Sequence, residues 1–364
     1  MPFRTPRRRL GALRPSFATP AFALAVALAS ALALPAAASD TLFWPSPWAP
    51  GQIWEYRTEL LDTDTKPGSV DAQRTTGIAT LRIARADDPR EGERLLQVWT
   101  TRDSRVEAVQ GDRTVADAMA SVIDDLDKIA VELRLDRDGR ADGVRNLAEI
   151  RPNVRAAMDG VLDQMVDAMI RTESPDMDDQ EREMVRAMVQ PMMAAQMDAL
   201  INDTSVHAML AADLEDFNAF TGTGHRIGLE SRQADPLYMP ISGQPLPTVR
   251  VYSAHTEPAR PGEASIAWTT ALDPDTATDD ALWTLAAEIA GEPALKGSTG
   301  RPIGVEFVEE GRITWRPADG AVLRMEIERR QRYGRDHQST SRLVYTLTGP
   351  PADAPATPAA DAAP

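Results

Sequence analysis

Residues 154–169, VRAAMDGVLDQMVDAM, decide the fold of this chain, because they have helical spacing between two flanks that have strand character. Apolar residues recur at i, i+4, i+7, i+8, i+11 and i+15 from Val154 onward, which places them on one helix face. Charged residues recur at every fourth position on the opposite face, from Arg155 to Asp167. The pattern predicts an amphipathic helix that ends near Ser174-Pro175, since a residue before proline is pushed out of the α region.

A second helix is predicted over 178–201, DDQEREMVRAMVQPMMAAQMDALI. Asp178 and Glu181 have the spacing of a capping box at its start. Its apolar residues come in adjacent pairs, so we expect it to contact neighbours on two sides. Pro191 lacks an N–H group and predicts a kink or a break. Thr204 or Ser205 would cap a third helix.

Ten of the fourteen methionines lie between residues 146 and 220. The simplest interpretation is that they fill a helical core with an unbranched apolar side chain. The alternatives are a pliable surface for a hydrophobic ligand or partner peptide, or a thioether copper(I) site that also uses His207. The candidate ligand-binding residues are Met184, Met188, Met192, Met193 and Met197.

Alternating apolar residues predict antiparallel strands on both flanks of the helices. Before the helices, the predicted strands are 53–61, 75–84, 95–106 and 131–135, with loops at 63–68 and 87–92 and a short helix at 116–126. After the helices, they are 248–255, 264–272, 312–316, 321–333 and 341–348, with a short helix capped by Asp279. The expected fold class is α+β: a curved antiparallel β-sheet, or two sheets, with a methionine-rich helical insertion packed on it.

The chain divides by composition into five segments. A secretory signal is expected at 1–38, because arginines precede an apolar run from Phe22 to Leu34 and a small-residue cleavage pattern at Ala36-Ala37-Ala38. An N-terminal β-rich part, 39–145, precedes the helical insertion, 146–221, and the C-terminal β-rich part of the same domain, 222–349. A proline- and alanine-rich tail, 350–364, is predicted to be disordered.

Composition places the protein in the periplasm of a Gram-negative bacterium, or outside the cell. Three lysines against thirty-six arginines are typical of GC-rich coding. The pair Arg7-Arg8 leaves twin-arginine export open beside the general route, and an uncleaved N-terminal anchor is the alternative to a cleaved signal. After cleavage we expect no stable membrane insertion, because no other segment has the apolar length to span a bilayer.

Charge and cysteine content exclude several functions. A formal net charge of −16 argues against nucleic-acid binding, since nucleic acid is itself negative. The chain has no cysteine, which removes disulfides, thiolate metal sites and cysteine nucleophiles. We expect no cofactor.

No catalytic motif occurs in the sequence, and the four histidines are scattered over different predicted elements. The sequence therefore favours a protein without catalytic activity. Asp136, Asp138 and Asp142 have the interval of a calcium loop, but an Asp-Gly hairpin turn explains the same residues more simply.

Two segments resemble exported bacterial β-rich proteins of unknown function. They are Gly51-x-x-Trp54-x-Tyr56 and the strand, turn and helix start from Val131 to Ile150. The resemblance implies a half-barrel of the kind that carries lipoproteins or lipids through the periplasm.

Three functional hypotheses follow. The first is a binding or carrier module for a hydrophobic small molecule or partner peptide. The second is a structural or interaction protein of the envelope, and the third is a hydrolase whose site is assembled from dispersed residues.

Overall fold

A computed structural model describes residues 40–88, 92–111, 113–173, 177–239, 245–273, 275–290, 295 and 298–349. The expected signal and tail, 1–38 and 350–364, lie outside the described residues, as does part of the expected loop at 87–92. These two segments therefore stay predictions.

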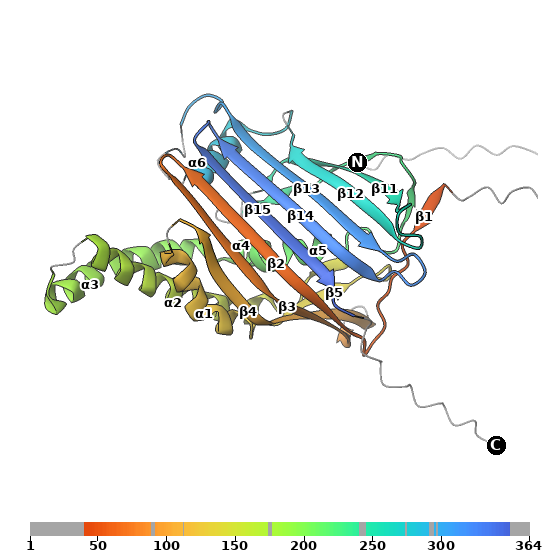
Figure 1. Ribbon diagram of the computed structural model, residues 1–364, viewed down its shortest axis with the longest axis horizontal. Helices are drawn as coiled ribbons and strands as arrows, with labels where there is room; N and C mark the ends of the chain where they lie inside the picture. Colours follow the sequence, from red (N-terminus) through yellow and green to blue (C-terminus); the bar gives the residue numbers. More distant parts are fainter. Residues whose placement is uncertain are drawn as a thin grey trace, which may run out of the picture. The chain divides into compact units, whose positions relative to one another are not determined.

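One antiparallel sheet of eleven strands dominates the fold (Figure 1). From edge to edge its strands are β6 (Ala141–Val144), β5 (Val131–Leu135), β4 (Gly92–Gln110), β3 (Ser69–Asp88), β2 (Ile53–Lys66), β15 (His337–Leu347), β14 (Val322–Tyr333), β13 (Val305–Trp315), β12 (Ala264–Leu272), β11 (Thr248–Thr256) and β8 (Ser231–Ala234). Two short pairs lie outside it: β1 (Thr41–Phe43) with β7 (Gly224–Arg226), and β9 (Leu237–Tyr238) with β10 (Pro245–Leu246). The predicted α+β fold with a large antiparallel sheet is confirmed.

The two β-rich flanks share this sheet, because β2 pairs with β15 along its length. The register runs from Tyr56 opposite Leu347 to Thr65 opposite Gln338. The alternative of two separate sheets is therefore wrong. The expected loop at 63–68 is also mostly wrong: β2 continues to Lys66, and only Pro67 and Gly68 turn the chain into β3.

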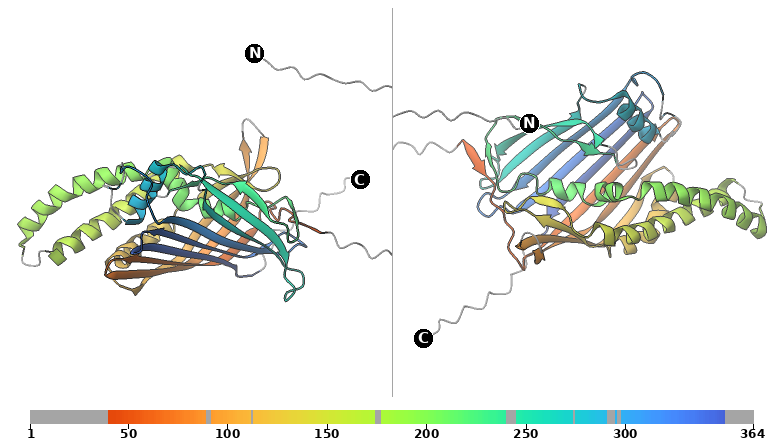
Figure 2. Two further views of the ribbon diagram at one scale, coloured as in Figure 1. Left: turned by 90° about the horizontal axis from the view of Figure 1, so that it is seen from above. Right: turned by 180° about the vertical axis from the view of Figure 1, so that it is seen from behind.

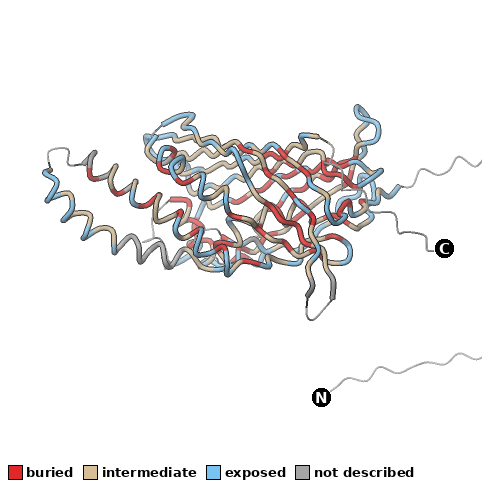
Figure 3. The backbone as a smooth tube through the Cα atoms, turned by 90° about the horizontal axis from the view of Figure 1, so that it is seen from below, coloured by how far each residue is buried: buried red, intermediate tan, exposed pale blue. Residues whose placement is uncertain are grey.

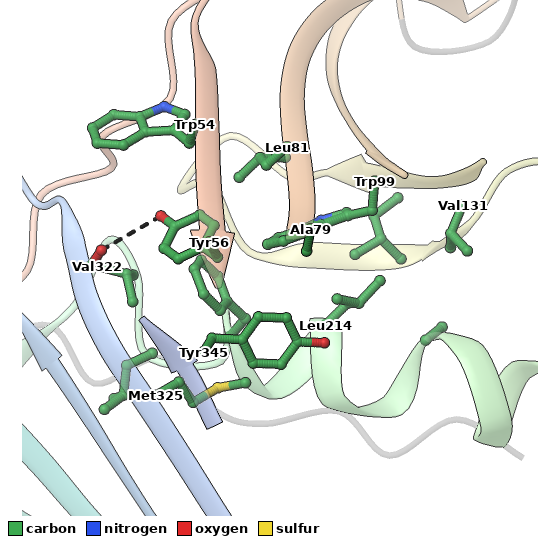
Figure 4. Packing of buried hydrophobic residues seen from close by; sticks show 14 of the residues in the cluster. Trp54, Tyr56, Ala79, Leu81, Trp99, Val131, Leu214, Val322, Met325 and Tyr345 are labelled. Atoms are coloured by element: carbon green, nitrogen blue, oxygen red, sulfur yellow. Dashed lines mark hydrogen bonds between the residues drawn. The ribbon is translucent and has the colours of Figure 1, made fainter. Parts of the chain in front are cut away.

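The inner face of the sheet, which carries Tyr56, Leu81 and Ile313, is apolar and buried. Aromatic rings from both flanks and from the helices fill part of it (Figure 4). Trp44 stacks on Trp315 with ring centroids 4.5 Å apart, and Phe217 meets the ring of Tyr56 edge-on at 5.2 Å. Because residues from both flanks and from the helices meet here, this cluster joins the whole fold.

The outer face is charged, as the alternation of a half-solvated antiparallel sheet requires. Opposite charges face each other across neighbouring strands: Arg330 with Glu310 at 2.8 Å, and Arg74 with Glu107 at 3.2 Å. Exposed pairs of this kind contribute about 0–1 kcal/mol each. They keep the sheet solvated and specify its register.

Six helices are described: α1 (Thr114–Leu126), α2 (Leu147–Glu173), α3 (Asp179–Leu200), α4 (Asp203–Leu210), α5 (Ala212–Asp216) and α6 (Asp279–Ala290). The start of α2 together with α4 and α5 packs on the inner face through Ile150, Val206 and Leu214. The α2–α3 hairpin extends beyond the sheet (Figure 2). The insertion thus packs on the sheet by its two ends, while α3 packs on α2.

Several predicted helix boundaries need correction. The helix over Pro191 is continuous, so the expected break is wrong. The cap of α4 is Asn202, whose side chain accepts from the N–H groups of Thr204 and Ser205, and α6 is capped by Thr278 Oγ1. The predicted capping box of α3 is confirmed, because Asp178 Oδ1 accepts from Glu181 N and Glu181 Oε2 accepts from Asp178 N.

Candidate functional site

One apolar face of each helix holds the α2–α3 hairpin together. The residues of this contact are Leu162, Val166 and Ile170 of α2, with Met177, Val185 and Val189 opposite them. Polar contacts also join the two helices: Arg186 pairs with Asp167, and Gln190 Nε2 donates to Asp163 Oδ1 at 2.9 Å. The adjacent pairs of apolar residues in α3 predict contacts on two sides of the helix. The contact with α2 is one of them.

The second apolar face of α3 is solvent-exposed. It consists of Met184, Ala187, Met188 and Pro191, which we call the outer stripe. Their spacing of i, i+3, i+4 and i+7 places them on one side of the helix. Met184 is 68% exposed and Met188 is 72% exposed. From Asp179 to Pro191 the backbone of α3 is coloured as exposed or intermediate, whereas α2 carries buried residues (Figure 3).

The predictions for the five candidate methionines have different outcomes. The structure brings Met184 and Met188 together one turn apart, and for these two the core interpretation is wrong. The side chains of Met192, Met193 and Met197 lie outside the described residues. His207, the histidine of the copper(I) alternative, contacts Glu215 through Nε2 at 2.9 Å, and this alternative stays a prediction. The binding role of the methionines stays a prediction.

A second cluster, which the sequence analysis missed, lies on the inner face of the sheet beneath α5. Its members are Arg250, Arg329, Asp213, Asp216, Asp235 and Glu309, and we call it the inner-face charge cluster. Arg250 reaches Asp216 and Asp235 at 2.7 Å each. Arg329 Nε donates to Glu309 Oε2 at 2.8 Å.

Glu309 lies at the centre of this cluster and is fully buried. The indole N–H of Trp268 donates to its Oε1 at 3.0 Å. Gly311 makes this possible, since a Cβ at that position would overlap the ring of Trp268. Charged residues at inward positions of alternating strands were the sequence signal that could have revealed the cluster.

Burial and pairing change the ionisation of two carboxyls in the cluster. Burial raises the pKa of Asp216 to about 7, against the opposing effect of the Arg250 guanidinium. Burial alone would also raise the pKa of Glu309, but Arg329 and Arg250 together hold it below its usual value. Four carboxyls share two guanidiniums, so one of them takes up a proton more readily than an ordinary carboxyl.

A cleft of about 370 Å³ opens beside the cluster. It is lined by His207, Glu215, Asp216, Asp235, Tyr238 and Arg250, among others. The hydrogen bond to Glu215 raises the pKa of His207. A histidine and carboxylate pair can move a proton, and a hydrolase that acts through a covalent intermediate also needs a nucleophilic hydroxyl within hydrogen-bond reach.

The hydroxyl groups nearest to the described histidines lie elsewhere. His225 contacts Thr223 Oγ1 at 2.7 Å, and His255 contacts Ser253 Oγ at 2.8 Å, in both cases a hydroxyl two positions earlier in the chain. The hydrogen bonds of the described residues therefore assemble no histidine with both a carboxylate and a hydroxyl. The dispersed-site hydrolase gains no support from this geometry.

The expected hairpin turn at 136–139 is confirmed. Asp136 Oδ1 accepts from the N–H groups of Asp138 and Arg140, both at 2.9 Å, and Gly139 has a φ of +87°. Asp142 pairs with Arg94 at 2.6 Å. Within the described ranges, no group of three or more histidine, aspartate or glutamate side chains is arranged to hold a metal ion.

Among the helices that the structure describes, none has the length and apolar character needed to cross a membrane.

Comparison with known proteins gives likeness to solved structures alone. No family model and no curated protein matches the chain. A solved structure described as "Lipid-protein interactions in lipovitellin" is similar with a TM-score of 0.43 and 11% identity. The likeness covers 85% of this chain and 26% of that one, so this chain spans about a quarter of the solved chain.

Proposed function

We propose that this protein is a non-catalytic binding module, exported to the periplasm, which takes a hydrophobic peptide segment of an envelope partner on the outer stripe of α3. The observation that carries the proposal is the exposure of Met184 and Met188 on a helix whose opposite apolar face is already packed. Export follows from the secretory pattern of residues 1–38.

Methionine suits such a surface because its flexible thioether adapts to different partner side chains. Fully burying one such side chain contributes about 1.5–3 kcal/mol. Two adjacent methionines on a protruding hairpin therefore supply a useful part of a modest binding energy, without any rearrangement of the sheet.

The inner face supports a small hydrophobic ligand less well. Its aromatic region is filled by the protein's own side chains, which include the fully buried Trp44, Tyr56 and Phe217. The cleft beside α4 is lined by Asp216, Asp235 and other charged groups, which an apolar ligand would desolvate at a cost. A peptide on the outer stripe displaces no buried aromatic side chain and desolvates none of these charged groups.

Site-specific crosslinking in cells tests this proposal. A photoreactive residue at position 188 is expected to give a discrete adduct that maps to one segment of a partner protein. Position 303 is a matched control, since Ile303 is 90% exposed and belongs to the segment before β13, outside α3. Equal crosslinking from 188 and 303, or none from 188, would contradict the proposal.

A further inference from the structure

We infer that the segment bound on the outer stripe is a cationic amphipathic helix. This inference rests on the proposed function and adds the chemistry of the partner. Three observations carry it: the shape of the stripe, the charges that flank it, and the charge balance of the hairpin.

The shape of the stripe favours a helix over an extended strand. Met184, Ala187, Met188 and Pro191 form a row about two turns long, which has the spacing of a helix–helix contact seam. Ala187 lies between the two methionines and lets a partner helix approach closely. A strand would need a free sheet edge to pair with, and α3 offers none.

Acidic side chains border the stripe on both sides. At about 100° per residue, Glu181 falls on the Met188 side of the stripe and Glu183 on the Ala187 side, and both lie toward its N-terminal end. Both glutamates are exposed. A partner helix seated on the stripe would place the borders of its own apolar face against these carboxylates.

The basic residues of α3 are turned to the other side and are engaged within the hairpin. Arg186 pairs with Asp167 of α2 and also lies 3.7 Å from Glu183, and Arg182 contacts Asp179 at 3.3 Å. Between residues 147 and 200 the sequence contains eleven acidic and five basic residues, a formal net charge of −6. Complementary charge on the partner would speed its encounter and fix its orientation.

A peptide series tests the inference on the full mature protein. Three helical peptides share one leucine face and carry lysine, glutamine or glutamate on the polar face. We expect the lysine peptide to bind at least about tenfold tighter than the glutamate peptide. The advantage should shrink as salt is raised from about 50 to 500 mM, because exposed charges are screened.

Paired variants locate the binding. Met184→Ser with Met188→Ser should weaken binding of all the peptides that bind, whereas Met209→Ser, at a methionine 44% exposed on α4, should not. Glu181→Gln with Glu183→Gln should weaken binding of the lysine peptide and leave binding of the glutamine peptide unchanged. Glu310→Gln on the outer face of the sheet is the matched control for charge.

The outcomes separate the inference from the proposed function. If all three peptides bind equally and the methionine variants weaken them, the peptide surface stands but the cationic partner is wrong. If no peptide binds, or the methionine variants have no effect on binding, both are wrong. A dimer of the protein alone that the methionine variants dissociate would assign the stripe to a second copy and overturn the inference.

Discussion

Neighbouring residues on β13 have opposite roles, because alternate side chains on a strand point to opposite faces. Glu309 points inward and accepts hydrogen bonds from Arg329 and Trp268. Glu310 points outward and pairs with Arg330 in solvent. A buried charge costs free energy unless its partners are retained, whereas an exposed one does not.

Glu309→Gln should therefore lower the free energy of unfolding by about 1.5–3 kcal/mol, because Arg329 Nε and the indole N–H of Trp268 lose their hydrogen bonds to a charged acceptor. Glu310→Gln should change it by less than about 1 kcal/mol. Urea denaturation monitored by tryptophan fluorescence measures both. Equal losses would show that the inner-face charge cluster does not contribute to stability.

Asp216 should make stability depend on pH near neutrality. Its pKa is raised to about 7 in the folded protein from an ordinary value of 3.8. The folded state then binds the proton more tightly than the unfolded state, so stability from this group is complete below about pH 4 and is lost as pH rises through 7. His207, whose pKa is also raised, acts in the same direction above pH 6.5.

We expect the urea midpoint of the protein to fall between pH 5.5 and 8, and to fall less in Asp216→Asn, which cannot ionise. His207→Gln is the companion variant that separates the smaller contribution of the imidazole. A midpoint with the same pH slope in Asp216→Asn as in the unaltered protein would refute the role of this carboxyl.

The two apolar faces of α3 explain why its sequence carries adjacent pairs of apolar residues. Val185 and Val189 face α2, while Met184 and Met188, one position before each, face solvent. The pairs predicted contact on two sides. Sequence alone did not show that one of the two sides stays open.

Substitutions at adjacent positions of α3 should therefore differ in their effect on stability. Val189→Ala should destabilise the hairpin by about 1 kcal/mol, because it removes buried methyl groups. Met188→Ala should change stability by no more than about 0.5 kcal/mol. Hydrogen exchange of the α3 amides measures both effects. If Met188→Ala loses more protection than Val189→Ala, the assignment of Val189 to the buried face is wrong.

Elements with strong alternation were predicted well. β5 and β12 begin and end at the expected residues, since apolar residues alternate through both. β2 is longer than expected, because Thr63, Asp64 and Thr65 pair with residues of β15 that no local pattern reveals. Pro191 was expected to interrupt its helix, and the turns on both sides nevertheless stay helical.

At the scale of the whole molecule, the joining of the two flanks by β2 and β15 and the inner-face charge cluster depend on contacts between distant residues. Arg250 and Glu309 are 59 positions apart and meet only because β11, β12 and β13 pair in order. Alternation places Glu309 on the inward face with Phe307 and Ile313, but the sequence does not show which guanidinium it meets. The outer stripe was more accessible to sequence reasoning, because it lies within one helix.

The most direct test of the account is nuclear magnetic resonance of labelled methionine methyl groups in the protein, titrated with the lysine peptide. The account predicts chemical-shift changes at Met184 and Met188, with none at the buried Met239 and Met325. Changes at Met209 without changes at Met184 and Met188 would place the binding surface elsewhere and contradict the account.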